Sequence, residues 1–107
     1  MNLQTSAQSE NLGKQLARLR QAYGVKQQDA ASRAGLSRST AYRLECGDHA
    51  VGLGEVLRYL EAIAPACTLQ DLLGGMDPAM QAMDAQAETR HRVRDGATVY
   101  AITRPLA

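Results

Sequence analysis

Two short helical segments joined by only three residues limit the fold of this chain more than any other stretch does. The segments cover residues 27–34 and 38–45, with Gly35-Leu36-Ser37 between them. Helices of about eight residues are marginal in water, so both must pack against other elements. Glycine at position 35 accepts a positive φ without steric cost, and Ser37 is a strong N-cap for the second helix. The pattern therefore predicts two helices joined by a tight turn and covered by the rest of the chain.

Helical patterns on both sides of this pair predict the helices against which the two short helices pack. A first helix is expected from near Ser9 to Gly24, with apolar residues recurring at helical spacing. A fourth helix is expected at about residues 53–64, where Pro65 prevents its extension. A short fifth helix begins at the capping-box-like sequence of residues 68–71. The fold class predicted from these patterns is all-α, with five helices.

The second helix of the short pair has two faces of different chemistry. Leu36, Ala41 and Leu44 are spaced to anchor it on its neighbours. The opposite face is rich in hydrogen-bond donors, which suit base edges and phosphates. Its residues are Arg38, Ser39, Tyr42 and Arg43.

The segment QQDAASRAGLSRSTAYRLECG, residues 27–47, resembles the helix-turn-helix of the Cro/cI-type (XRE-like) repressor family. The resemblance extends over about residues 12–73 without an insertion. It implies a lambda-repressor-like DNA-binding domain of five helices. Lys26 departs from the family pattern, which usually has a Ser or Thr cap there, so the second helix is expected to begin less well capped.

The resemblance also implies roles for single residues. Base edges in the major groove would be contacted by Arg38, Ser39, Tyr42 and Arg43. Phosphates would be met by a second group, namely Lys26, Gln27, Ser37, Thr40 and His49. Arg20 and Glu45 stand where family members often carry a buried ion pair between the first helix and the end of the third.

Charge is distributed unevenly along the chain. Residues 1–60 carry eight basic and five acidic side chains, whereas residues 61–88 carry five acidic side chains and no Lys or Arg. Residues 89–107 carry four Arg and one Asp. A basic front half favours an anionic partner, in agreement with double-stranded DNA.

A boundary is predicted at Gly74-Gly75, which separates a DNA-binding domain at residues 9–75 from a C-terminal extension at residues 76–107. Asp77-Pro78 is a good start for a short helix. Within that helix two side chains are expected to face a partner, Met80 and Met83.

The end of the extension has a different pattern. Basic residues occupy most of residues 90–94, Asp95-Gly96 follows, and residues 98–103 are β-prone. This order predicts a β-strand or hairpin, whose open edge would pair with a second copy of the chain. Apolar contacts in that homodimer are expected from Val99, Tyr100 and Ile102.

Together these patterns predict a dimeric, sequence-specific transcriptional repressor. The alternative is an antitoxin, in which the extension binds a toxin protein while the DNA-binding half regulates its own operon. No catalytic constellation, cofactor motif or metal-ligand spacing stands out, and the role of Cys46 stays open. With no signal-peptide pattern or membrane-spanning run, we expect a cytoplasmic protein without membrane contact.

Overall fold

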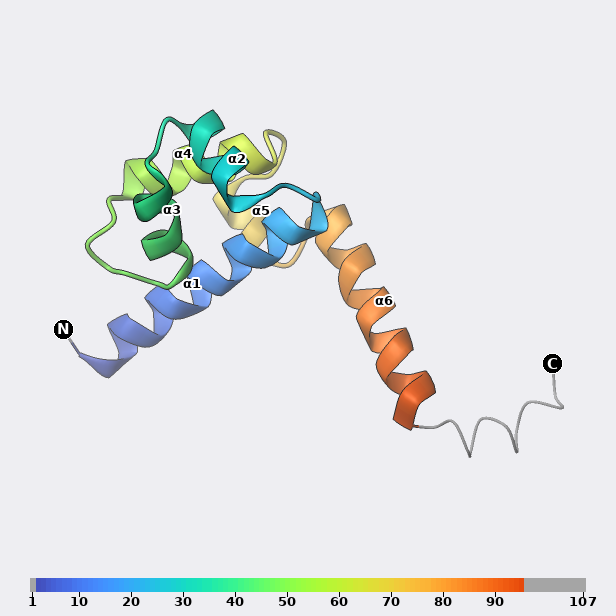
Figure 1. The fold of residues 1–107 in the computed structure, drawn as a ribbon. Coiled ribbons are helices and arrows are strands. Elements are labelled where there is room, and N and C mark those ends of the chain that lie inside the picture. The colour runs from blue at the N-terminus through green and yellow to red at the C-terminus, as the bar shows by residue number, and fades with distance from the viewer. Residues whose placement is uncertain (1, 96–107) are drawn as a thin grey trace, which may run out of the picture.

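A computed structural model describes residues 2–95, and these residues form helices and connecting turns only (Figure 1). The helices in chain order are α1 (Leu3–Ala22), α2 (Gln27–Ala34), α3 (Arg38–Glu45), α4 (Leu53–Ile63), α5 (Leu69–Leu73) and α6 (Pro78–Asp95). The all-α prediction is confirmed for this part of the chain. None of the helices described is long and apolar enough to cross a membrane.

The turn between α2 and α3 has the predicted geometry. Gly35 has φ of 72° and lies in the left-handed region. The amide of Leu36 donates to the carbonyl of Ala31 at 2.9 Å, which closes the end of α2. The hydroxyl of Ser37 then accepts from the amide of Thr40 at 3.0 Å and caps α3. A left-handed glycine followed at once by an N-cap explains how three residues turn the chain.

Helix α1 begins at Leu3, six residues before the start that was expected at Ser9. The side chain of Asn2 accepts from the amide of Thr5 at 2.8 Å and supplies the N-cap. No proline or glycine follows until Gly13, so the helix continues through Ser9 without interruption. The signal that was missed is this earlier cap.

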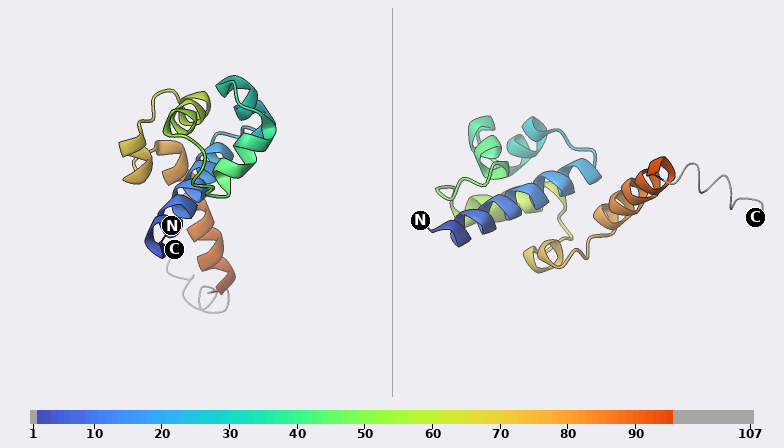
Figure 2. Two further views of the ribbon diagram at one scale, coloured as in Figure 1. Left: turned by 90° about the vertical axis from the view of Figure 1, so that its left-hand side faces the viewer. Right: turned by 90° about the horizontal axis from the view of Figure 1, so that it is seen from below.

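The core is narrow because α2 and α3 face it with alanine. Ala30, Ala31 and Ala41 are at most 1% exposed, and this lets α2 lie close to both α3 and α4. Two views at right angles show α2 to α5 gathered beside the long α1 (Figure 2). The larger buried side chains fill the space between them, and the four largest are Tyr59, Leu16, Leu19 and Leu72.

Helix α1 meets the end of α3 at a pair of glycines. A Cβ on Gly13 would lie 2.6 Å from the carbonyl oxygen of Glu45, and one on Gly47 would lie 2.5 Å from Cα of Glu10. Both distances are shorter than non-bonded carbon contacts allow. The two backbones therefore approach closely only because neither position has a side chain.

The start of α6 belongs to the core rather than to a separate surface. The expectation that Met80 faces a partner is wrong, because its side chain is 5% exposed and packs in the hydrophobic core. Asp77 is 3% exposed and caps α6 by accepting from the amide of Met80 at 3.0 Å. It also accepts a hydrogen bond from the hydroxyl of Tyr23 at 2.8 Å, which ties α6 to the end of α1. Met83 is half-buried and lines a hollow between the same two helices.

The hairpin prediction is wrong for its first arm. The backbone of residues 90–95 continues α6 as a helix, because the Ala- and Gln-rich run before it favours helix and nothing interrupts the chain before Asp95. The second arm at residues 98–103 lies outside the described residues. So do the three predicted dimer contacts Val99, Tyr100 and Ile102.

The Tyr23–Asp77 hydrogen bond makes stability depend on alkaline pH. Donation to the Asp77 carboxylate, with some burial, raises the pKa of Tyr23 to about 12, above the value of about 10 in an unfolded chain. The contribution of this hydrogen bond to the free energy of unfolding is complete below about pH 10. It is lost as the pH rises towards about 12, because the phenol of the unfolded chain ionises first. The free energy of unfolding, measured with urea, should be higher for wild type than for Tyr23→Phe at about pH 8, and the difference should be smaller at about pH 11. A difference that is the same at both pH values would contradict this linkage.

Candidate nucleic-acid interface

One face of α3 projects four polar or aromatic side chains into solvent. Arg38, Ser39, Tyr42 and Arg43 are all exposed, and we call them the recognition face. Their spacing of one and four residues places them on the same side of a helix. On the opposite side Ala41 and Leu44 are buried and hold α3 against the core. The structure thus brings together the four residues that were predicted to contact bases.

The N-terminus of α2 lies beside the start of α3. Lys26 is the N-cap residue of α2 and makes no side-chain capping bond, as its departure from the family pattern predicted. A hollow of about 320 Å³ lies here, lined by Lys26, Gln27, Gln28 and Arg38. Amide groups in the first turn of a helix have no partner within that helix, and the positive end of the helix dipole lies there. The hollow therefore suits a phosphate group.

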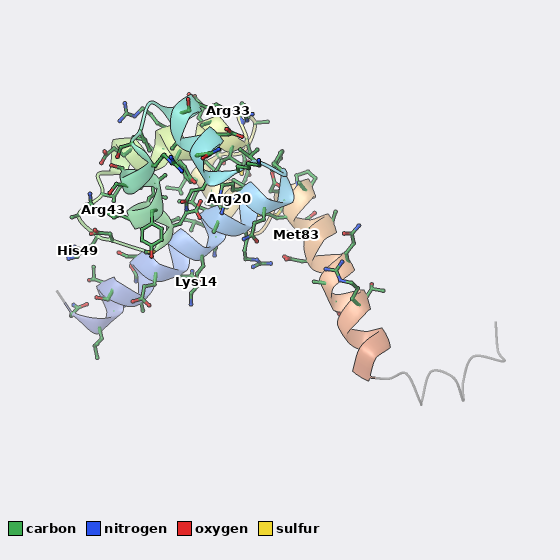
Figure 3. The ribbon with its side chains drawn as sticks, viewed as in Figure 1. Lys14, Arg20, Arg33, Arg43, His49 and Met83 are labelled. Atoms are coloured by element: carbon green, nitrogen blue, oxygen red, sulfur yellow. The ribbon has the colours of Figure 1, made fainter. Side chains whose placement is uncertain are left out.

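Three further residues were predicted to lie near phosphates. The hydroxyl of Ser37 donates to Oγ1 of Thr40 at 2.8 Å, so these two side chains lie together at the start of α3. His49 is exposed in the loop that follows α3 (Figure 3). Ser37 and Thr40 flank one end of the recognition face, and His49 flanks the other.

Arg43 has a partner that the sequence did not reveal. Its Nε donates to Oδ2 of Asp48 at 2.8 Å, while the other oxygen of Asp48 accepts from the amide of Ala50 at 2.8 Å. This ion pair raises the pKa of Arg43 and lowers that of Asp48. Because the bond uses Nε, it orients the guanidinium without using the two terminal nitrogens that contact a guanine edge in bidentate fashion.

Helix α3 is held against α1 by an ion pair. Nε and Nη2 of Arg20 donate to the two carboxylate oxygens of Glu45 at 2.7 and 3.1 Å. The side chains are only 16% and 9% exposed. Nη1 of Arg20 also donates to the carbonyl of Val25 at 3.0 Å. The structure therefore contains the Arg20–Glu45 pair in a bidentate form.

Glu45 has two more donors, which sequence reasoning missed. Nε2 of Gln27 donates to Oε1 at 3.0 Å, and the hydroxyl of Tyr59 donates to Oε2. Tyr59 is fully buried in α4, and this burial is the main reason that its pKa is raised. A buried tyrosine hydroxyl needs a hydrogen-bond partner, which was the available signal. Glu45 thus joins α3 to α1, α2 and α4 at a single carboxylate.

These contacts define a candidate interface with a buried support and an exposed surface. The support is the carboxylate of Glu45 with its donors, and the exposed surface is the recognition face together with the N-terminus of α2.

A family model described as a helix-turn-helix domain matches residues 11–65, just over half of the chain. No curated protein and no solved structure matches the chain. The chain therefore belongs to the helix-turn-helix domain family, a family of DNA-binding domains, with α2 and α3 as its two characteristic helices.

Proposed function

We propose that this protein is a sequence-specific transcriptional regulator, a repressor that binds an operator through the major groove. The observation that carries the proposal is the recognition face of α3, exposed along its length and anchored from below at Glu45. A major groove admits one α-helix, and the donors on this face match the acceptors on base edges. A helix that is held rigidly can read those edges at a defined distance.

Base contacts are assigned to the recognition face. Arg43 and Arg38 can donate two hydrogen bonds to O6 and N7 of guanine, the commonest specific contact to a base pair. Ser39 can contact several bases through its hydroxyl, and the ring of Tyr42 offers apolar surface to a thymine methyl group. These side chains lie on the first and second turns of α3, which enter the groove first in a helix-turn-helix.

Phosphate contacts are assigned to the residues around the recognition face. Gln27 uses one hydrogen of Nε2 for Glu45, which leaves the second hydrogen for a phosphate oxygen. Lys26 adds charge at the same hollow. On either side of the helix the assigned residues are Ser37, Thr40 and His49. Such contacts orient the protein on the duplex and carry no sequence information directly.

Binding to DNA should show this division of roles. With the full-length protein and an operator selected from random duplexes, Arg43→Ala is expected to lose about 5-fold to about 150-fold of discrimination at one base pair. Gln27→Ala should weaken binding to all duplexes alike. Arg90→Ala, on the exposed part of α6, is the matched control for loss of an arginine. If Arg38→Ala and Arg43→Ala together leave the preference unchanged, the assigned recognition face is wrong.

The repressor is proposed to act as a homodimer. One recognition helix contacts only a few base pairs, too few to select one site in a genome. A two-fold dimer places two such helices about 34–36 Å apart, one turn of DNA. The apolar contacts are assigned to Val99, Tyr100 and Ile102, and sedimentation of full-length chains with aspartate at these positions tests the assignment.

An antitoxin remains the second candidate function. The observation that favours it is that α6 leaves the end of α1 and extends away from the other helices (Figure 1). A helix exposed in this way offers a surface to a protein partner, with residues 81, 82 and 84–90 exposed along it. Co-purification of a toxin encoded beside this protein would support the antitoxin, and a repressor with no such partner would exclude it.

A further inference from the structure

A second hollow adjoins the recognition face on the side of α1. It has a volume of about 420 Å³ and lies among α1, the start of α2 and the end of α3. We call it the α1–α3 hollow, and its lining consists of Lys14, Ala17, Arg18, Gln27, Tyr42, Glu45 and Cys46. Gln27 and Tyr42 are shared with the surface assigned to DNA, so a duplex on that surface would pass the hollow. Lys14 projects outward from the middle of α1 (Figure 3).

The lining combines two kinds of chemistry. Lys14 and Arg18 are exposed on one side and contribute positive charge. Ala17 and the ring of Tyr42, which is 61% exposed, contribute apolar surface. The carboxylate of Glu45 does not oppose an anion here, because Arg20 pairs with both of its oxygens. The hollow therefore suits a ligand that has an anionic group next to an apolar one.

We propose that the α1–α3 hollow holds one sugar–phosphate unit of the DNA backbone at the edge of the major groove. Lys14 and Arg18 meet the phosphate, and the carbon atoms of the deoxyribose pack on Ala17 and Tyr42. This extends the interface from the helix-turn-helix pair to α1. The proposal rests on the proposed function, because it needs a duplex already bound to the recognition face.

Arg18 connects this site to α6. Its guanidinium forms an ion pair with the carboxylate of Asp84, and the side chains are 47% and 49% exposed. An exposed pair of this kind is weak, so a phosphate can displace Asp84 at little cost. Asp84 thus competes with DNA for Arg18. Asp84→Asn is expected to raise DNA affinity, by up to about five-fold.

The salt dependence of DNA binding tests the proposal. Each phosphate neutralised contributes about 0.9 to the slope of log K against log salt concentration. Lys14→Gln in the full-length protein should reduce the slope by up to about 0.9. Adding Arg18→Gln should bring the total reduction to about 0.9 and no further, because the two side chains share one phosphate, and neither variant should change sequence preference. Arg90→Gln carries the same loss of charge on α6 and controls for long-range effects. Slopes equal to that of Arg90→Gln would overturn the proposal.

Cys46 provides a second measurement in the same hollow. Its side chain is exposed, whereas Cys67 is buried, so N-ethylmaleimide should modify Cys46 first. A saturating duplex is expected to slow this modification at least several-fold in wild type. An unchanged rate with DNA bound would show that the hollow stays open and would overturn the proposal. If the wild-type protein binds no duplex at all, the proposed function fails instead, so the two failures are distinguishable.

Discussion

Glu45→Ala is expected to lower the free energy of unfolding by about 3–5 kcal/mol, a large part of the stability of a domain of this size. The substitution removes the acceptor of four hydrogen bonds and leaves Arg20, 16% exposed, without its counter-charge. It also leaves the hydroxyl of the fully buried Tyr59 without that acceptor. Breaking a buried pair costs more than the pair contributes, because the remaining charge has been removed from water. Urea denaturation of the two chains measures the difference.

Asp84→Ala is the matched control for Glu45→Ala. It also deletes an acidic partner of an arginine, but in a pair whose side chains are about half exposed. Its expected cost is below about 1 kcal/mol, because water screens both charges. Equal losses for the two variants would show that the partly buried Arg20–Glu45 pair contributes no more to stability than an exposed pair does.

Gly13→Ala is expected to destabilise the protein by about 3 kcal/mol, although alanine is normally the better helix former. The added Cβ would meet the carbonyl oxygens of Glu45 and Leu44 at 2.6 and 2.8 Å. Both are backbone atoms, so α1 and the end of α3 would have to separate. Because Glu45 lies at this contact, the separation would also strain its pair with Arg20, and operator affinity should fall with stability.

Gly54→Ala is the control for this effect. Gly54 lies in the first turn of α4, and a Cβ there would meet no atom within 4 Å. The same change of residue is therefore expected to leave stability unchanged or to raise it, by up to about 1 kcal/mol. Thermal unfolding of the two variants separates helix propensity from close packing. A Gly13→Ala chain as stable as Gly54→Ala would contradict the close approach of α1 and α3.

The helix ends that depend on local chemistry were predictable from sequence. Gly35 and Ser37 set the turn between α2 and α3, and Thr68 caps α5 as its sequence indicated. These signals act within a few residues, so they have the same meaning in any fold. The early start of α1 was also encoded locally, by the cap at Asn2, but Ser9 offered a second candidate cap in the sequence.

The direction of the side chains in α6 was not predictable in this way. Met80 has the same chemistry whether it packs inward or against another chain, and only the approach of α6 to α1 buries it. The basic run at residues 90–94 has mixed local preferences, and the helix entering it decided the outcome. A residue that is equally compatible with burial or exposure, or with helix or strand, takes the state that a tertiary contact or the preceding helix imposes.

The sequence by itself therefore determined which residues could face DNA, because the spacing of α3 separates its exposed donors from Ala41 and Leu44. Only the tertiary structure decided how that face is held. Tyr59 and Gln27 lie on other helices, well separated from Glu45 in the sequence, yet both donate to its carboxylate. Likewise, Asp48 orients Arg43 only after Gly47 has turned the chain. Periodicity is a property of one helix, whereas a hydrogen bond between helices depends on how they pack.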